Sequence, residues 1–172
     1  PPRPSNYKPG TGVDRYATFA ADWLSVDRTG VLDGVLEAFE SHQKVIIQAA
    51  NGVGKSYSAA VGAIAGLYTN PDTTVNITSG SYGQLDDTIW KPIKSLHRKS
   101  KLPGRTLDNT RELRTELDEE WYAKALSPQY PGDLEGRHND RMLYIIEEAD
   151  KPGITQEHID SALSTLTDEQ DR

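Results

Sequence analysis

The sequence predicts an α/β fold in which a mainly parallel sheet lies between layers of helices. Short β-branched apolar runs alternate along the chain with longer segments whose apolar residues recur every three or four positions. The resulting order, strand and helix three times over, favours parallel strands joined by helices that cover both faces of a sheet. The 172 residues are enough for one domain with its own core.

Three segments are expected to form strands. Residues 44–50 (KVIIQAA) are a short β-branched run ahead of a glycine-rich stretch, which is typical of a buried strand. Residues 73–80 (TTVNITSG) have the same character. Residues 141–150 (RMLYIIEEAD) give a third apolar strand with an acidic end.

Apolar spacing predicts five helices. They are expected at residues 17–24, 31–39, 55–68, 82–99 and 153–163. In the fourth, Leu85, Ile89, Ile93 and Leu96 share one face, and Pro92 is expected to kink or break the helix. Residues 113–126 fit either a hairpin that turns at 118–120 or a helix, and residues 127–140 form a loop.

Composition excludes several classes of protein. The chain has no cysteine, so disulfides, zinc–thiolate sites and thiol catalysis are excluded. No apolar run approaches the ~20 residues that span a bilayer, and no secretory signal is present, so we expect an intracellular protein without a membrane partner. With a net charge of −7, any contact with DNA needs a local basic patch or another domain. Residues 1–12 are rich in Pro and Gly and are expected to form an extended arm, followed by one domain over 13–172.

A candidate phosphate-binding loop lies at residues 49–56 (AANGVGKS), between an expected strand and an expected helix. It ends in Gly54-Lys55-Ser56, as the pattern G-x-x-x-x-G-K-[ST] requires, but it begins with Ala49 in place of glycine. Backbone N–H groups and the positive end of the helix would face the phosphates.

Each loop residue has an expected role. Lys55 would reach the β- and γ-phosphates, and the Ser56 hydroxyl would bind Mg²⁺. The loop as a whole would cradle the nucleotide with Ala50, Asn51, Gly52, Val53, Gly54, Lys55 and Ser56. The other interpretation is a glycine-rich turn before a helix with an exposed lysine.

An acid pair, Glu147 and Glu148, lies about ninety positions after the loop. It directly follows four apolar residues of an expected strand. In the usual arrangement the first acid of such a pair holds the Mg²⁺ shell and the second activates the attacking water. Glu147, one methylene longer than the usual Asp, would hold the metal through a water, and Glu148 would be the general base. Together, loop and acids predict a P-loop NTPase of the ASCE (RecA-like) class, a three-layer sandwich. The absence of an N-K-x-D motif favours ATP over GTP.

Over roughly residues 30–165 the chain resembles the ATPase domain of large terminase subunits, the motors that package DNA into viral capsids. Besides the phosphate loop, two motifs carry the resemblance. One is Thr78-Ser79-Gly80-Ser81 with Gln84. The other is Gly136-Arg137-His138, which lies ahead of residues 145–149 (IIEEA).

The resemblance implies a homo-oligomeric ring that binds a portal protein in the host cytoplasm. The ring would hydrolyse ATP to push double-stranded DNA into a capsid. A small terminase subunit would be a further partner. It also implies an arginine finger that completes a neighbouring subunit's site. Arg137 lies where such a finger is expected, and Arg141 and Arg105 are the competing candidates. We expect the family's coupling motif and nuclease domain beyond Arg172.

Some features depart from the family pattern or stay open. The loop has Asn51 and Val53 where many terminases carry an arginine, and the residue that reads adenine is not placed, although Trp23 or Tyr7 could stack on the base. The basic stretch 91–101 could meet DNA phosphates or could be a solvated helix face; its cations are Lys91, Lys94, Arg98, Lys99 and Lys101. Two other functions fit: a helicase or recombinase-like ATPase, and a nucleotide-binding assembly domain without turnover, which Ala49 and Glu147 favour.

Overall fold

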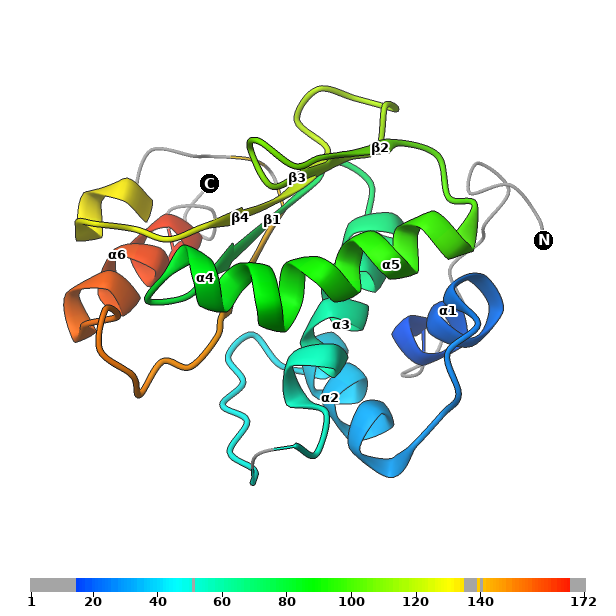
Figure 1. The fold of residues 1–172 in the computed structure, drawn as a ribbon, viewed down its shortest axis with the longest axis horizontal. Coiled ribbons are helices and arrows are strands. Elements are labelled where there is room, and N and C mark those ends of the chain that lie inside the picture. Colours follow the sequence, from blue (N-terminus) through cyan, green and yellow to red (C-terminus); the bar gives the residue numbers. More distant parts are fainter. Residues whose placement is uncertain (1–14, 51, 135–138, 140, 168–172) are drawn as a thin grey trace.

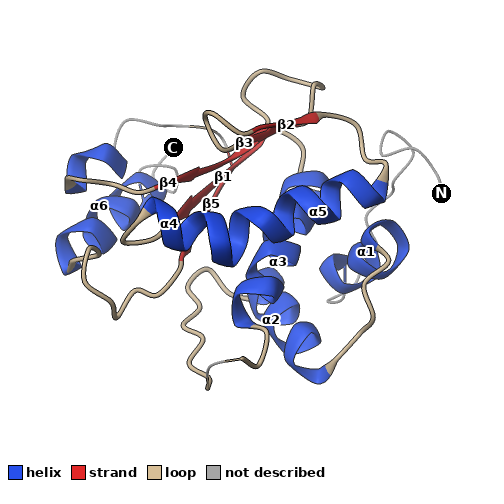
Figure 2. Ribbon diagram, viewed as in Figure 1, coloured by secondary structure: helices blue, strands red, loops and turns tan. Residues whose placement is uncertain are grey.

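The computed structural model describes residues 15–50, 52–134, 139 and 141–167, and it is an α/β structure with a five-stranded mixed sheet (Figures 1 and 2). The helices are α1 (Arg15–Leu24), α2 (Gly30–Ser41), α3 (Lys55–Thr69), α4 (Tyr82–Leu85), α5 (Lys91–Ser100) and α6 (Gln156–Thr167). A π-helical turn, η2 (Asp86–Trp90), joins α4 to α5, and a 3₁₀ helix, η3 (Pro131–Leu134), precedes the last strand.

The sheet has the order β2-β3-β4-β1-β5. Its strands are β1 (Thr73–Thr78), β2 (Arg105–Leu107), β3 (Glu112–Arg114), β4 (Tyr122–Leu126) and β5 (Arg141–Ile146). β1 is parallel to both β4 and β5, whereas β3 is antiparallel to β2 and β4. The expected mainly parallel sheet is therefore a mixed one, because a hairpin, and not a helix, leads into β4.

The expected strands at 73–80 and 141–150 are confirmed as β1 and β5, but the strand expected at 44–50 is absent. Residues 42–50 form no strand, and Ile46 is 96% exposed. The segment, cyan in Figure 1, leaves the body of the molecule below the sheet. A β-branched run becomes a strand only where a neighbouring edge pairs with its N–H and C=O groups. Within the described residues no strand pairs with this segment, although β5 is an end strand of the sheet.

All five expected helices are present, and α3 is the most deeply buried of them. Its alanines and glycines let neighbouring elements approach closely. A methyl group on Gly62 would lie 2.7 Å from the Phe39 ring of α2, and one on Gly66 would lie 3.0 Å from Leu143 of β5. The main core fills the space between the sheet and α1, α2, α3 and α5. A smaller cluster of Leu126, Leu134 and Ala162 lies by η3 and α6.

The helix expected at 82–99 is continuous from α4 through η2 into α5, and its four apolar residues are buried as expected. Pro92 does not break it. In a regular helix the Pro92 ring would clash with the carbonyl of Thr88, and the wider π turn just before Pro92 relieves this clash.

The middle of the chain settles one open choice. Residues 113–126 form the hairpin of β3 and β4, not a helix. β2 corresponds to no element expected from the sequence, and η3 lies within the segment expected to be loop. The expected arm, 1–12, and the motif 136–138 lie outside the described residues. No helix in the described part of the chain is long and apolar enough to cross a membrane.

Candidate functional site

The candidate phosphate loop has the backbone that its glycines allow. Gly52 has φ +80° and Gly54 has φ +92°, and Gly54 precedes the first turn of α3. Both angles lie in the left-handed region, where a side chain is strained. Ala49 has no positive φ, so the methyl group in place of the usual first glycine causes no backbone strain. Asn51 lies outside the described residues.

Lys55 folds back over the start of the loop. Its Nζ donates to the backbone oxygens of Ala49, at 2.7 Å, and Ala50, at 2.9 Å. The ammonium group therefore lies across the curl of the loop. An anion bound in the curl would offer it stronger hydrogen bonds than these carbonyl oxygens do, because donor and acceptor would then both be charged.

The loop and the acid pair are in contact. Ser56 Oγ donates to Glu147 Oε2 at 3.1 Å, although the two residues lie 91 positions apart. Glu147 is buried, and its N–H donates to the Thr78 carbonyl at 2.8 Å, which extends the β1–β5 ladder by one residue. Burial raises the pKa of Glu147, and the charge of Glu148 acts in the same direction. The Ser56 hydrogen bond and the Lys55 charge oppose both.

Glu148 leaves the strand through a left-handed backbone turn, with φ +51°. Its Oε2 accepts a hydrogen bond from Gln84 Nε2 at 2.9 Å. Gln84 Oε1 in turn accepts from the hydroxyls of Ser79, at 3.3 Å, and Ser81, at 3.2 Å. The sequence singled out Gln84 only through the family motif, and nothing in the sequence predicted its bond to Glu148.

Close backbone packing holds the two loops that carry these groups. A Cβ on Gly80, after β1, would lie 2.5 Å from the Pro152 carbonyl oxygen. Gly153 has φ +106°, and its Cβ would lie 2.7 Å from Gly80 Cα. Only glycine fits at both positions, so the loop after β5 is locked against the loop that leads to Gln84.

A metal ion would need ligands beyond this chain's carboxylates. The described residues contain no cluster of three or more His, Cys, Asp or Glu side chains that could hold one. The Ser56 hydroxyl and the Glu147 carboxylate are oxygen donors in contact with each other, and Mg²⁺ in nucleotide sites takes one or two protein ligands beside phosphates and waters. The donor set fits Mg²⁺ bound together with a nucleotide.

Two residues are suggested to stack on adenine, Trp23 and Tyr7, and three are candidates for the arginine finger: Arg137, Arg141 and Arg105. Trp23 is 4% exposed and stacks on Phe19 in the core, so the suggestion that it stacks on the base is wrong. Tyr7 and Arg137 lie outside the described residues. Arg141 begins β5, at the far end of the strand from Glu147, and Arg105 pairs with Glu116 at 3.3 Å.

The basic stretch 91–101 is partly neutralised by acids. Lys91 pairs with Asp87 at 2.5 Å, and Lys94 pairs with Asp108 at 2.8 Å. The other three cations are exposed: Arg98, Lys99 and Lys101. If this face meets DNA, these three are better placed to do so than the two paired lysines.

Comparison of the chain with models of known families, with curated proteins and with solved structures found no match.

Proposed function

We propose that this domain is a Mg²⁺-dependent ATPase of the P-loop class and, following its resemblance, the motor domain of a large terminase subunit that drives double-stranded DNA into a viral capsid. The contact of Ser56 with Glu147 carries the ATPase proposal. It joins a glycine-rich loop at a helix N-terminus to two acids at the end of a neighbouring strand, and hydrolysis of a nucleoside triphosphate requires both.

The groups on the chain have distinct tasks. Lys55 exchanges its two carbonyl partners for β- and γ-phosphate oxygens. Ser56 and Glu147 would hold Mg²⁺, which when bound would neutralise charge on those phosphates. Glu148 accepts a proton from water as the water oxygen bonds to the γ-phosphorus and the bond to the β–γ bridging oxygen breaks, releasing ADP and phosphate. Gln84 orients the Glu148 carboxylate.

The motor proposal rests on the resemblance, and the place of Gln84 supports it. The family motif pairs residues 78–81 with Gln84, and in this chain Gln84 contacts the proposed base directly. The same proposal includes a ring on a portal protein, a small terminase subunit as partner, and Arg137 as the finger. A helicase or recombinase-like motor would use the same site. Such a motor would differ from a terminase in that it would hydrolyse ATP faster with single-stranded DNA than with double-stranded DNA.

One observation favours a second function, a nucleotide-binding assembly domain without turnover. Residues 44–50, which lead into the loop, lie outside the sheet and are largely exposed. A loop without a strand behind it could bind phosphate through α3 alone and lack the rigidity that catalysis needs.

ATP hydrolysis and ATP binding by matched variants distinguish these functions. We expect Lys55→Ala to weaken binding and turnover, and Glu148→Gln to keep binding while turnover falls by roughly 10²- to 10⁴-fold. Lys44→Ala, an exposed lysine just ahead of the loop, is the control and should match the wild type. Wild-type turnover that survives Glu148→Gln would refute the assigned base. Wild-type binding without turnover, alone or with double-stranded DNA, would favour the assembly domain.

A further inference from the structure

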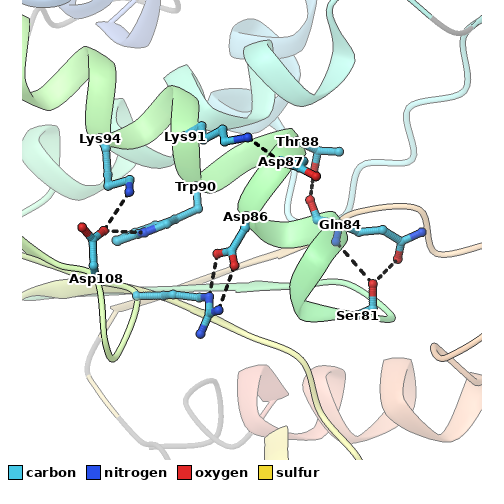
Figure 3. A network of polar contacts seen from close by, with 10 residues as sticks. Ser81, Gln84, Asp86, Asp87, Thr88, Trp90, Lys91, Lys94 and Asp108 are labelled. Atoms are coloured by element: carbon cyan, nitrogen blue, oxygen red, sulfur yellow. Dashed lines mark hydrogen bonds and ion pairs between the residues drawn. The ribbon is translucent and has the colours of Figure 1, made fainter.

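A polar network surrounds the short helix that carries Gln84 (Figure 3). Ser81 caps the start of this helix, and its Oγ accepts the N–H of Gln84 at 3.3 Å. Only four residues of α4 follow before the π turn η2 begins. These residues are the first turn of the continuous helix that runs through η2 into α5, and the first turn of a helix frays unless caps or outside contacts hold it. Contacts from outside therefore help to set where Gln84 points.

Arg111 supplies such contacts on both sides of Gln84. Its Nε and Nη2 donate to the two carboxylate oxygens of Asp86, at 2.7 and 2.8 Å. Its guanidinium also lies over the Tyr82 ring, 4.4 Å from the centroid. Tyr82 and Asp86 stand one helical turn apart with Gln84 midway between them. One side chain thus holds the turn that contains Gln84, by a two-pronged ion pair and a cation–π contact.

Arg111 is itself well anchored. Its carbonyl accepts the N–H of Ala125 at 2.9 Å, which ties it to β4. The same turn carries Asp108, which accepts hydrogen bonds from Trp90 Nε1, at 3.3 Å, and Lys94 Nζ, at 2.8 Å. The turn between β2 and β3 therefore contacts the helix at two points, one at each end of the π turn. π turns of this kind occur often at functional sites.

We propose that Arg111 is a positioning residue for the proposed general base: through Tyr82 and Asp86 it fixes Gln84, and Gln84 fixes the carboxylate of Glu148. This inference rests on the proposed ATPase. Arg111 touches no reacting group. It acts on the rate through the orientation of the base, and a small misplacement of a catalytic group is costly.

The chain provides a matched control three residues away. Arg114 donates through Nε to Glu112 at 2.8 Å, and its guanidinium lies 5.5 Å from the centroid of the Tyr122 ring. It makes the same two kinds of contact, an ion pair with a carboxylate and a guanidinium near an aromatic ring, but its partners lie on β3 and β4 and not on α4 or η2. Loss of Arg114 therefore reports the structural cost alone.

Steady-state ATP hydrolysis by Arg111→Asn and Arg114→Asn tests the proposal. Asparagine suits position 111 because the backbone there has φ +51°. We expect Arg111→Asn to lower kcat roughly ten-fold with KM for ATP within about two-fold, whereas Arg114→Asn leaves both within about two-fold. The exchange Asp86→Arg with Arg111→Asp should restore most of the lost kcat. An unchanged kcat in Arg111→Asn, a KM effect alone, or an equal loss in Arg114→Asn would overturn the proposal.

A readout independent of hydrolysis keeps the two proposals apart. The side-chain amide NMR signal of Gln84 is assigned by its loss in Gln84→Ala and should move in Glu148→Gln. We expect the same signal to move in Arg111→Asn and to stay in Arg114→Asn. If the wild type shows no turnover, a shifted Gln84 signal upholds the role of Arg111 while the ATPase fails. An unmoved Gln84 signal in Arg111→Asn overturns the role of Arg111 whatever the turnover.

Discussion

The two halves of the candidate site are built differently, although similar apolar β-branched runs precede both in the sequence. On the acid side, β5 pairs with β1 along its whole length, and Glu147 continues the ladder at the buried end. On the loop side, residues 44–50 pair with no described strand and lie largely in solvent. One half is held by the sheet; among the described residues, the other is held by the N-terminus of α3, the fold-back of Lys55 and the Ser56–Glu147 hydrogen bond.

The difference shows what holds the proposed catalytic groups in place. Glu147 is fixed by the strand ladder and by Ser56, and Glu148 by Gln84 and the loop packing at Gly80 and Gly153. The loop has no comparable support, so we expect a bound nucleotide to order it by supplying acceptors for its N–H groups. We thus expect the two acids to be held in place before a nucleotide binds, whereas the loop becomes ordered when it binds one.

The largest effect that tests this contrast is on stability. Ile77 of β1 is fully buried, so Ile77→Ala should lower the free energy of unfolding by about 3–4 kcal/mol, through lost burial and the cavity left behind. Ile46→Ala is the matched change in the exposed run and should alter it by less than about 0.5 kcal/mol. Denaturant unfolding measures both. A cost above about 1 kcal/mol for Ile46→Ala would show that residues 44–50 pack as a strand after all.

Next in size is the loop packing beside the acids. Gly80→Ala places a methyl group against the Pro152 carbonyl and should cost about 2–3 kcal/mol, because backbone must move to make room. Gly83→Ala, three residues on and inside α4, has open space around it and should be neutral or stabilising by up to about 1 kcal/mol. Equal thermal melting temperatures for the two variants would contradict the close contact of the loops.

The smallest effect is a pH dependence of stability at Glu147. Because its pKa is raised in the folded state, ionisation of Glu147 favours unfolding. The contribution of the protonated Glu147 side chain to folding stability is complete below the ordinary pKa of about 4.5. This contribution is lost as pH rises through the pKa of Glu147 in the folded protein. In chelator, Glu147→Gln should therefore be more stable than the wild type at pH 7, with the gap closing toward pH ~4.5. A gap that widens on acidification would contradict the burial of this carboxylate.

Much of the local structure was readable from the sequence. Helical spacing placed Leu85, Ile89 and Ile93 on the buried face of their helix, and the apolar run 141–146 predicted β5. The pair Asp87 and Lys91 has the i, i+4 spacing of a helix ion pair.

What stayed out of reach depends on partners far along the chain. Strand propensity predicted 44–50, but it carries no information on whether an edge is free to pair. β2 has only three residues, too few for a periodic signal. Arg111 lies 25 residues from Asp86, so nothing local predicts their pair, and the bond of Gln84 to Glu148 spans 64 residues.

The most direct measurement is the affinity for ATP of wild type, Ser56→Ala and Glu147→Gln, each with Mg²⁺ and with a chelator. If the two halves hold one MgATP between them, both substitutions weaken binding roughly 10- to 100-fold when Mg²⁺ is present. Both should have little effect in the chelator. A wild type that does not bind ATP, or losses in the two variants that do not depend on Mg²⁺, would contradict a shared metal–nucleotide site.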